Sequence, residues 1–320
     1  MTKEITTEKS TAEKAKTAET LKTEEQKPET ELRYGLKNDY MFRATLQSSQ
    51  RVLEGLVSAL LDIPLHEIKE CVIENPIILG EQIDDKTCIL DVKILLNNDK
   101  RLNIELQTTD YGDWPDRSLL YLCRAFDDLH AGQEYFELKP TIHIGILDFT
   151  LFPDNPEFYS EYLLMNTRTH KIYSSKFSIR VLDLTQTETV PEEEKQTDLY
   201  YWAKLFCAQS WEEIAMLAEK NKSIEEAAAT MKKLNADEKI KLQCEARERY
   251  ELDMLSASRN AYRNGVREGE KRGEERGIRI GEERLNQLNR LLAEQDRVDD
   301  IIKAASDEEY RKKLYEELKL

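Results

Sequence analysis

Two carboxylates, Asp91 and Glu105, lie on either side of a polar turn in the stretch "ILDVKILLNNDKRLNIELQ", residues 89–107. Apolar residues occupy the even-numbered positions 90–96 and 102–106 of this stretch, and polar or charged residues occupy most of the odd-numbered ones. Such an alternation is typical of two half-buried strands joined by a turn. Oxygen ligands from one or two carboxylates are what Mg²⁺ prefers, so the chemistry of interest here is metal binding.

The length of the connecting turn decides whether the two carboxylates meet. Directly opposed residues of an antiparallel pair share one face of the sheet. A three-residue turn at 97–99 therefore places Asp91 opposite Glu105, and it also pairs Lys93 with Asn103 and Leu95 with Arg101. A turn of two or four residues would oppose apolar to polar positions, which burial of one face disfavours.

Two interpretations of this polar face stay open. Opposed like charges destabilise a sheet, and a bound Mg²⁺ or Mn²⁺ ion would remove that repulsion. Alternatively the face is simply solvated, as in many amphipathic hairpins, and Lys93 neutralises Asp91 or Glu105 without a metal.

The segments before the hairpin predict helices that could add a further acid. "LKNDYMFRATL" and "SSQRVLEGLVSALLDIP" indicate two helical segments or one bent helix, with Ser49 as an N-cap of the second. Asp39 is a candidate third metal ligand or, equally, a helix-capping residue. Glu54 is a weaker candidate for the same metal site.

A helix is expected directly after the hairpin, over 114–132. Pro115 suits its first turn and Gly132 its end, and an apolar stripe is formed by Leu119, Leu122, Phe126 and Leu129. The opposite face carries Arg117, Tyr121, Arg124 and Asp128. That face is either solvated or, through Arg117 and Tyr121, in contact with a phosphate beside the metal site.

Further strands and helices complete an α/β pattern. Residues 71–80 indicate an irregular edge strand because Pro76 removes a ladder donor. Residues 140–152 indicate a strand that is covered on both faces, and 159–166 and 177–184 could extend the sheet. From Asp198 to the end the pattern is helical.

These elements, in this order, resemble the PD-(D/E)XK nuclease superfamily, and more closely its recombination-promoting nuclease (Rpn) transposase branch. The resemblance rests on "LKNDYMFRATL", on "ILDVKILLNNDKRLNIELQ" and on "RSLLYLCRAFDDLHAGQEYFELKPTIHIGILDF", and it covers roughly residues 34–152. It implies a restriction-endonuclease-like core, a mixed β-sheet flanked by helices, followed by a mostly helical C-terminal region.

The same resemblance implies a catalytic and metal-binding set. Asp91 matches the first acid of the family and Glu105 the second, whereas Gln107 stands where many relatives have Lys. A lysine can stabilise developing charge, but a glutamine offers only neutral hydrogen bonds. Lys93, on the same face, is a candidate to supply the missing cation.

The composition limits the protein class. The net charge of −16 is unusual for a DNA-binding protein, since such binding draws on Lys and Arg contacts to phosphate, although a bound cation changes the sign locally. The first 31 residues hold no aromatic and almost no large aliphatic side chain, which predicts a disordered tail over 1–33. The scattered cysteines suit a reducing cytoplasm, and no apolar run is long enough for a membrane span.

The C-terminal helix carries glycines every four residues, at 265, 269, 273, 277 and 281. This stripe is either part of a solvated, frayed segment or a close contact between two helices, which would give a homodimer. We therefore expect four segments: the tail 1–33, a nuclease-like α/β domain at 34–190, a helical region at 191–257, and the glycine-repeat helix with a final helix at 258–320.

The sequence as a whole predicts a cytoplasmic Mg²⁺-dependent DNA endonuclease, a hydrolase of phosphodiester bonds linked to recombination, transposition or mobile elements. Asp91, Glu105 and Gln107 would be catalytic, and Asp91, Glu105 and Asp39 would bind the metal. Lys93, Arg117 and Tyr121 would contact the phosphate. The alternative is a catalytically degenerate nuclease fold that acts as a DNA-binding or self-associating module.

Overall fold

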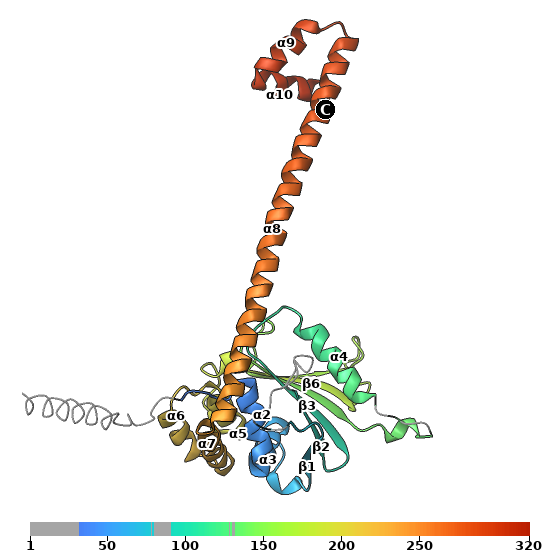
Figure 1. The fold of residues 1–320 in the computed structure, drawn as a ribbon. Coiled ribbons are helices and arrows are strands. Elements are labelled where there is room, and N and C mark those ends of the chain that lie inside the picture. The colour runs from blue at the N-terminus through green and yellow to red at the C-terminus, as the bar shows by residue number, and fades with distance from the viewer. Residues whose placement is uncertain (1–31, 78, 80–90, 128, 130–131) are drawn as a thin grey trace, which may run out of the picture. The chain divides into compact units, whose positions relative to one another are not determined.

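The computed structural model describes residues 32–77, 79, 91–127, 129 and 132–320. Nearly all of the expected disordered tail, together with Cys88 and Asp128, lies outside these residues. Contacts divide the chain into two compact units, one that ends at Glu248 and one from Arg249 to Leu320. Figure 1 shows the elements of both.

The first unit is built on a six-stranded mixed sheet in the order β1-β2-β3-β4-β6-β5. Its strands are β1 (Cys71–Ile73), β2 (Val92–Leu96), β3 (Lys100–Gln107), β4 (Thr141–Leu147), β5 (Tyr159–Leu163) and β6 (Phe177–Asp183). The central strands β3, β4 and β6 are parallel to one another, and the pairings β1–β2, β2–β3 and β5–β6 are antiparallel. The expected mixed sheet with flanking helices is confirmed.

The register predicted for the hairpin is also confirmed. Lys93 pairs with Asn103 and Leu95 with Arg101, around a turn at residues 97–99. Asn97 and Asn98 take left-handed backbone conformations, with φ of 51° and 55°, which asparagine tolerates better than most residues. Strand β2 begins at Val92, so Asp91 lies one residue before the paired region.

Helices on one face of the sheet cover its apolar positions (Figure 1). They are α2 (Asp39–Ser48), α3 (Gln50–Leu61), α5 (Asp198–Cys207), α6 (Trp211–Ala218) and α7 (Lys222–Asn235). Ser49 takes an extended conformation between α2 and α3, so the chain forms two helices there. Buried side chains from the sheet and from these helices form one hydrophobic core.

Helix α4 (Trp114–Phe126) covers the opposite face of the sheet (Figure 1). The helix is shorter than expected, and a different face of it packs on the sheet. Leu119, which belongs to the predicted apolar stripe, is 47% exposed, whereas Trp114, Ser118 and Leu122 are buried. The sheet face beneath carries polar side chains, so the face of α4 that packs on it mixes Arg117 and Tyr121 with apolar residues. The prediction of Leu119 as a core residue was therefore wrong.

The long helix α8 (Glu238–Glu294) begins in the first unit, and its greater part belongs to the second. In the second unit, α9 (Val298–Ser306) and α10 (Glu308–Glu317) pack on its end through Leu288, Leu292, Ala304 and Leu314. The five repeat glycines are exposed within a continuous helix, and a Cβ added to any of them would meet nothing within 4 Å among the described residues. No described helix is both long and apolar enough for a membrane span.

Candidate functional site

The polar face of β3 is buried. Asn103 is 1% exposed, Glu105 2% and Gln107 6%, although their even-numbered neighbours point into the main core. Helix α4 covers these polar side chains, so the solvated alternative does not hold for this strand. An ionisable group buried in this way needs partners, because its charged form is costly out of water.

Glu105 lies at the centre of this buried polar face. Its Oε1 pairs with the guanidinium of Arg117 from α4, and its Oε2 lies 3.7 Å from Nε2 of His143 on β4. Among the described residues, neither carboxylate oxygen accepts a hydrogen bond of good geometry. The carboxylate is thus held by charge from one side and left without directed partners on the other.

Burial raises the pKa of Glu105 to about 7. The positive charge of Arg117 opposes that shift, and the negative charge of Asp91 adds to it. Val92 pairs with Ile104, so Asp91 and Glu105 are the next residues along the two antiparallel strands. Burial also raises the pKa of Asp91, against the opposing charges of Lys93 and Arg43.

Arg43 of α2 fixes the backbone at Asp91. The Arg43 residue is 2% exposed. Its guanidinium donates to the carbonyl oxygens of Asp91 and Asn75. The Nδ2 of Asn75 donates to the same Asp91 carbonyl at 3.0 Å. The sequence pattern gave no sign of this role for Arg43, since a lone arginine in a helix is usually a surface residue.

The other residues predicted near the site differ in their surroundings. Gln107 donates from Nε2 to the carbonyl of Thr109 at 2.8 Å, and its Oε1 is buried with no hydrogen bond from a described residue. The Arg117 guanidinium lies 5.7 Å from the ring centre of Tyr121. Lys93 is exposed beside Asp91.

Asp39 and Glu54 have partners away from this cluster. Oδ1 of Asp39 accepts from Nε of Arg247 near the start of α8 at 3.1 Å, and Oδ2 accepts from Nε at 2.9 Å and from Nη2 at 2.5 Å. Glu54 accepts from Gln50 at 2.8 Å. No group of three or more His, Cys, Asp or Glu residues suited to a metal occurs in the part of the chain that the structure describes.

His143 is a neighbour of Glu105 that the sequence reasoning missed. It is fully buried on β4, opposite Asn103 in the parallel pairing of β3 and β4. The signal that could have found it is a single histidine within the apolar run "TIHIGIL", where a polar group must have a buried partner.

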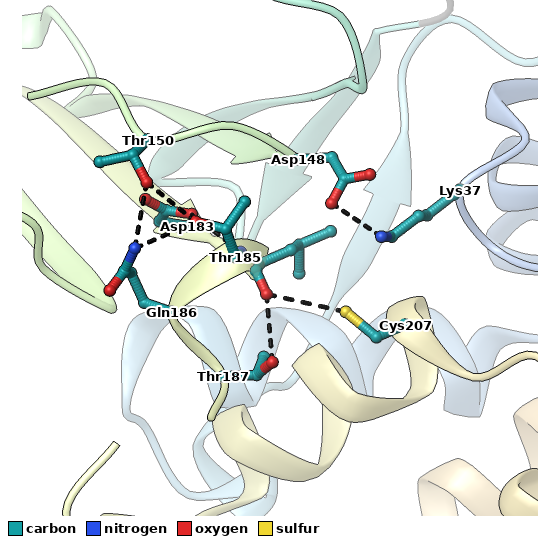
Figure 2. A network of polar contacts seen from close by, with 9 residues as sticks. Lys37, Asp148, Thr150, Asp183, Thr185, Gln186, Thr187 and Cys207 are labelled. Atoms are coloured by element: carbon teal, nitrogen blue, oxygen red, sulfur yellow. Dashed lines mark hydrogen bonds and ion pairs between the residues drawn. The ribbon is translucent and has the colours of Figure 1, made fainter. Parts of the chain in front are cut away.

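A second polar network lies at the carboxyl ends of β4 and β6 (Figure 2). Lys37 pairs with Asp148 at 2.7 Å, and Asp183 accepts from the hydroxyl of Thr185 at 2.6 Å. Hydroxyl and amide contacts of Thr150 and Gln186 extend this network. Lys37 is therefore engaged with Asp148, and its charge is not directed at Glu105 by any described contact.

The donor atoms of the buried face fit an oxygen-liganded divalent cation. Four oxygens there are buried and accept no hydrogen bond from a described residue: both carboxylate oxygens of Glu105, Oδ1 of Asn103 and Oε1 of Gln107. Mg²⁺ is typically bound by one or two carboxylates together with water and substrate phosphate. A cation would have to displace the Arg117 guanidinium from Glu105 or share the carboxylate with it.

The comparisons with known proteins gave one family match. A family model described as "PD-(D/E)XK nuclease family transposase" matches residues 36–261, which is more than two thirds of the chain. The match includes the hairpin, α4 and the central parallel strands. No curated protein and no solved structure matched the chain.

Proposed function

The chain belongs to the PD-(D/E)XK nuclease transposase family, and from that membership we propose that it is a metal-dependent DNA endonuclease. The observation that carries this proposal is Glu105, a buried carboxylate whose pKa is raised to about 7, in part by the negative charge of Asp91. Its Oε1 has Arg117 as its ion-pair partner, and its Oε2 accepts no hydrogen bond from a described residue. A structural carboxylate in a core would be expected to have its oxygens satisfied.

Nucleases of this family generally use divalent metal ions. Asp91 and Glu105 would hold Mg²⁺ or Mn²⁺, with the amide oxygen of Gln107 near it. The ion, when bound, would lower the pKa of a water molecule and stabilise charge on the phosphate. Gln107 would orient that water or the phosphate through a neutral hydrogen bond.

Cationic and hydroxyl groups around the acid pair would contact the DNA backbone. Arg117 pairs with Glu105 in the absence of substrate, and a phosphate arriving beside the metal would offer it a second acceptor. Lys93 is exposed next to Asp91, and Tyr121 lies under the Arg117 guanidinium. These three side chains would position the phosphate without reading its sequence.

The cellular setting is inferred from the family description and from the state of the cysteines. The family description links the chain to transposases, so we propose a role in recombination, transposition or the biology of mobile elements. The described cysteines 71, 123, 207 and 244 are free, which supports the expectation of a reducing cytoplasm.

A plasmid-nicking assay tests the proposal. The wild-type chain should nick supercoiled DNA with Mg²⁺ or Mn²⁺, and Asp91→Ala should abolish the nicking. Asp99→Ala is the matched control, because Asp99 is an exposed acid in the turn of the same hairpin. Nicking that survives in Asp91→Ala would exclude the proposed site.

A second candidate function has the same fold but no catalytic activity. Gln107 replaces the family lysine, and Arg117 already neutralises Glu105; both observations favour a degenerate nuclease that acts as a DNA-binding or self-associating module. Calorimetric titration separates the two functions, because the module should bind no Mn²⁺, or bind it equally well after Glu105→Ala. Self-association through the glycine stripe is tested by the mass in solution of the full chain and of Gly273→Leu.

A further inference from the structure

A chain of polar side chains joins the two acids of the site through β3 and β4. The Nδ2 of Asn103 lies 3.0 Å from Nδ1 of His143, and Nε2 of His143 lies 3.7 Å from Oε2 of Glu105. The Asn103 side chain also hydrogen-bonds Asp91 and thereby lowers the pKa of that carboxyl. Asn103 thus contacts His143, and His143 in turn lies next to Glu105.

The contacts of Asn103 determine which nitrogen of His143 carries the proton. The atom of Asn103 that lies 3.0 Å from Nδ1 of His143 is the amide nitrogen Nδ2, which can only donate. Nδ1 must therefore be the unprotonated acceptor. The proton of the neutral ring then lies on Nε2, the nitrogen next to Glu105.

The surroundings of the ring keep it neutral and fixed in place. His143 is fully buried, and its ring centre lies 5.5 Å from that of Trp114 and 6.3 Å from that of Tyr121, both on α4. Burial, together with the nearby charge of Arg117, lowers the pKa of His143 to about 4. Among the described residues, Nε2 donates no hydrogen bond, so its N–H is available to Glu105.

We propose that His143 is a positioning residue, locked by Asn103 in the tautomer that carries its proton on Nε2, and that it orients the Glu105 carboxylate for the metal. The proposal rests on the proposed function for its metal step. Metal-binding carboxylates are commonly held by such outer partners. Here the Nε2–H of His143 would hold Oε2 of Glu105 in place, while Oε1 of Glu105 leaves the Arg117 guanidinium and binds the cation.

The tautomer is measured directly by ¹⁵N NMR of the metal-free, histidine-labelled protein. We expect His143 to show one neutral tautomer, protonated at Nε2, and Asn103→Leu to make the two tautomers exchange. At pH 8, above the raised pKa of Glu105, Glu105→Gln should shift the Nε2 proton resonance, because it replaces a charged acceptor with a neutral one. A wild-type ring protonated at Nδ1, or an Nε2 resonance indifferent to Glu105→Gln, would overturn the proposal.

A pair of substitutions separates positioning from packing. Gln at 143 is long enough to place an amide N–H where Nε2 lies, whereas Asn reaches only the place of Nδ1. His143→Asn should weaken Mn²⁺ binding in calorimetry by about 10- to 100-fold, and His143→Gln should restore most of the affinity. His66→Gln, at an exposed histidine, is the control. Equal loss in both variants at 143, with unchanged melting, would contradict the proposal.

If the proposed metal-dependent nuclease function is wrong, the experiments give a different set of results. If the wild-type chain neither binds Mn²⁺ nor nicks DNA, the proposed function is wrong and the metal step of His143 falls with it. The NMR measurements need no metal, and they would still decide whether Asn103 sets the tautomer and whether His143 contacts Glu105.

Discussion

The indole ring of Trp114 on α4 lies directly over Gly145 on β4. A Cβ added to Gly145 would lie 2.2 Å from Cζ2 of the indole, a distance that real Cβ contacts essentially never show. Gly145 is also the residue paired with Glu105 across β3 and β4. This close approach therefore holds α4, and Arg117 on it, against the sheet beside the buried carboxylate.

Gly145→Ala should consequently loosen α4 from the sheet. The indole is rigid and buried, so the new methyl group can be accommodated only by displacing the helix. We expect a loss of roughly 2 kcal/mol in the free energy of unfolding, the order that overpacking of a core costs, together with weaker Mn²⁺ binding. Urea denaturation and calorimetry measure the two effects.

Gly269→Ala is the control for this substitution. Gly269 is in an exposed helical position with open space around it, and alanine there should raise stability by up to about 1 kcal/mol. A Gly145→Ala variant as stable as the wild type would mean that α4 does not lie on the sheet as described.

The raised pKa of Glu105 has a definite consequence for stability against pH. In the folded chain this acid holds its proton up to about pH 7, well above its ordinary value of 4.5. Between these values the folded state binds more protons than the unfolded state, so the free energy of unfolding falls as pH rises. A shift of this size corresponds to roughly 3 kcal/mol.

Comparison with Glu105→Gln isolates this effect, because the variant does not titrate at position 105. The wild type should lose stability relative to Glu105→Gln as the pH of urea denaturation rises from 4 to 8. A relative gain in the wild type would mean that the charge of Arg117 outweighs burial and depresses the pKa of Glu105.

The hairpin register could be predicted from the sequence because two local constraints agree. The apolar face of β2 and β3 must be buried, which requires apolar residues to oppose apolar ones. Only a turn with an odd number of residues does this, and a three-residue turn places Lys93 opposite Asn103. The rotation of α4 could not be predicted in the same way. It covers a polar face, so the usual rule that the apolar stripe points inward placed Leu119 in the core when it lies at the surface.

The partners of Glu105 across the sheet were equally inaccessible to local reasoning. His143 reaches Glu105 through the parallel pairing of β3 with β4, and the register of that pairing depends on the long connection between the two strands. Arg43 fixes the backbone at Asp91 from a helix much earlier in the chain. Sequence periodicity indicates which face of a strand is polar, but it does not say what covers that face.

Substitution of Asp39 tests whether this acid binds the metal or stabilises the fold. Its contact with Arg247 is partly buried, with 11% and 15% of the two side chains exposed, and it joins α2 to the start of α8. Asp39→Asn should lower the free energy of unfolding by roughly 1–3 kcal/mol and leave Mn²⁺ affinity nearly unchanged. Asp116→Asn is the control, as an exposed acid in the first turn of α4. A large loss of Mn²⁺ affinity in Asp39→Asn would instead support Asp39 as the third ligand.

Gln107→Lys tests what the missing family lysine costs. Position 107 follows Glu105 on the same face of β3, and its side chain is 6% exposed, so a lysine there would place its charge near the two acids. We expect the rate of plasmid nicking to rise by about 10- to 100-fold, the order of a positioned acid–base group. Gln107→Met, which keeps the length and removes the polar group, should nick no faster than the wild type.

The same substitution distinguishes a slow enzyme from a degenerate one. Burying an unpaired lysine is costly, but Asp91 and Glu105 would offset that cost, so Gln107→Lys should melt close to the wild type. A stable Gln107→Lys variant that binds Mn²⁺ and still fails to nick DNA would show that more than the lysine has been lost. That result would favour the binding module over the nuclease, because the variant would contain the lysine, both acids and a bound metal and would still be inactive.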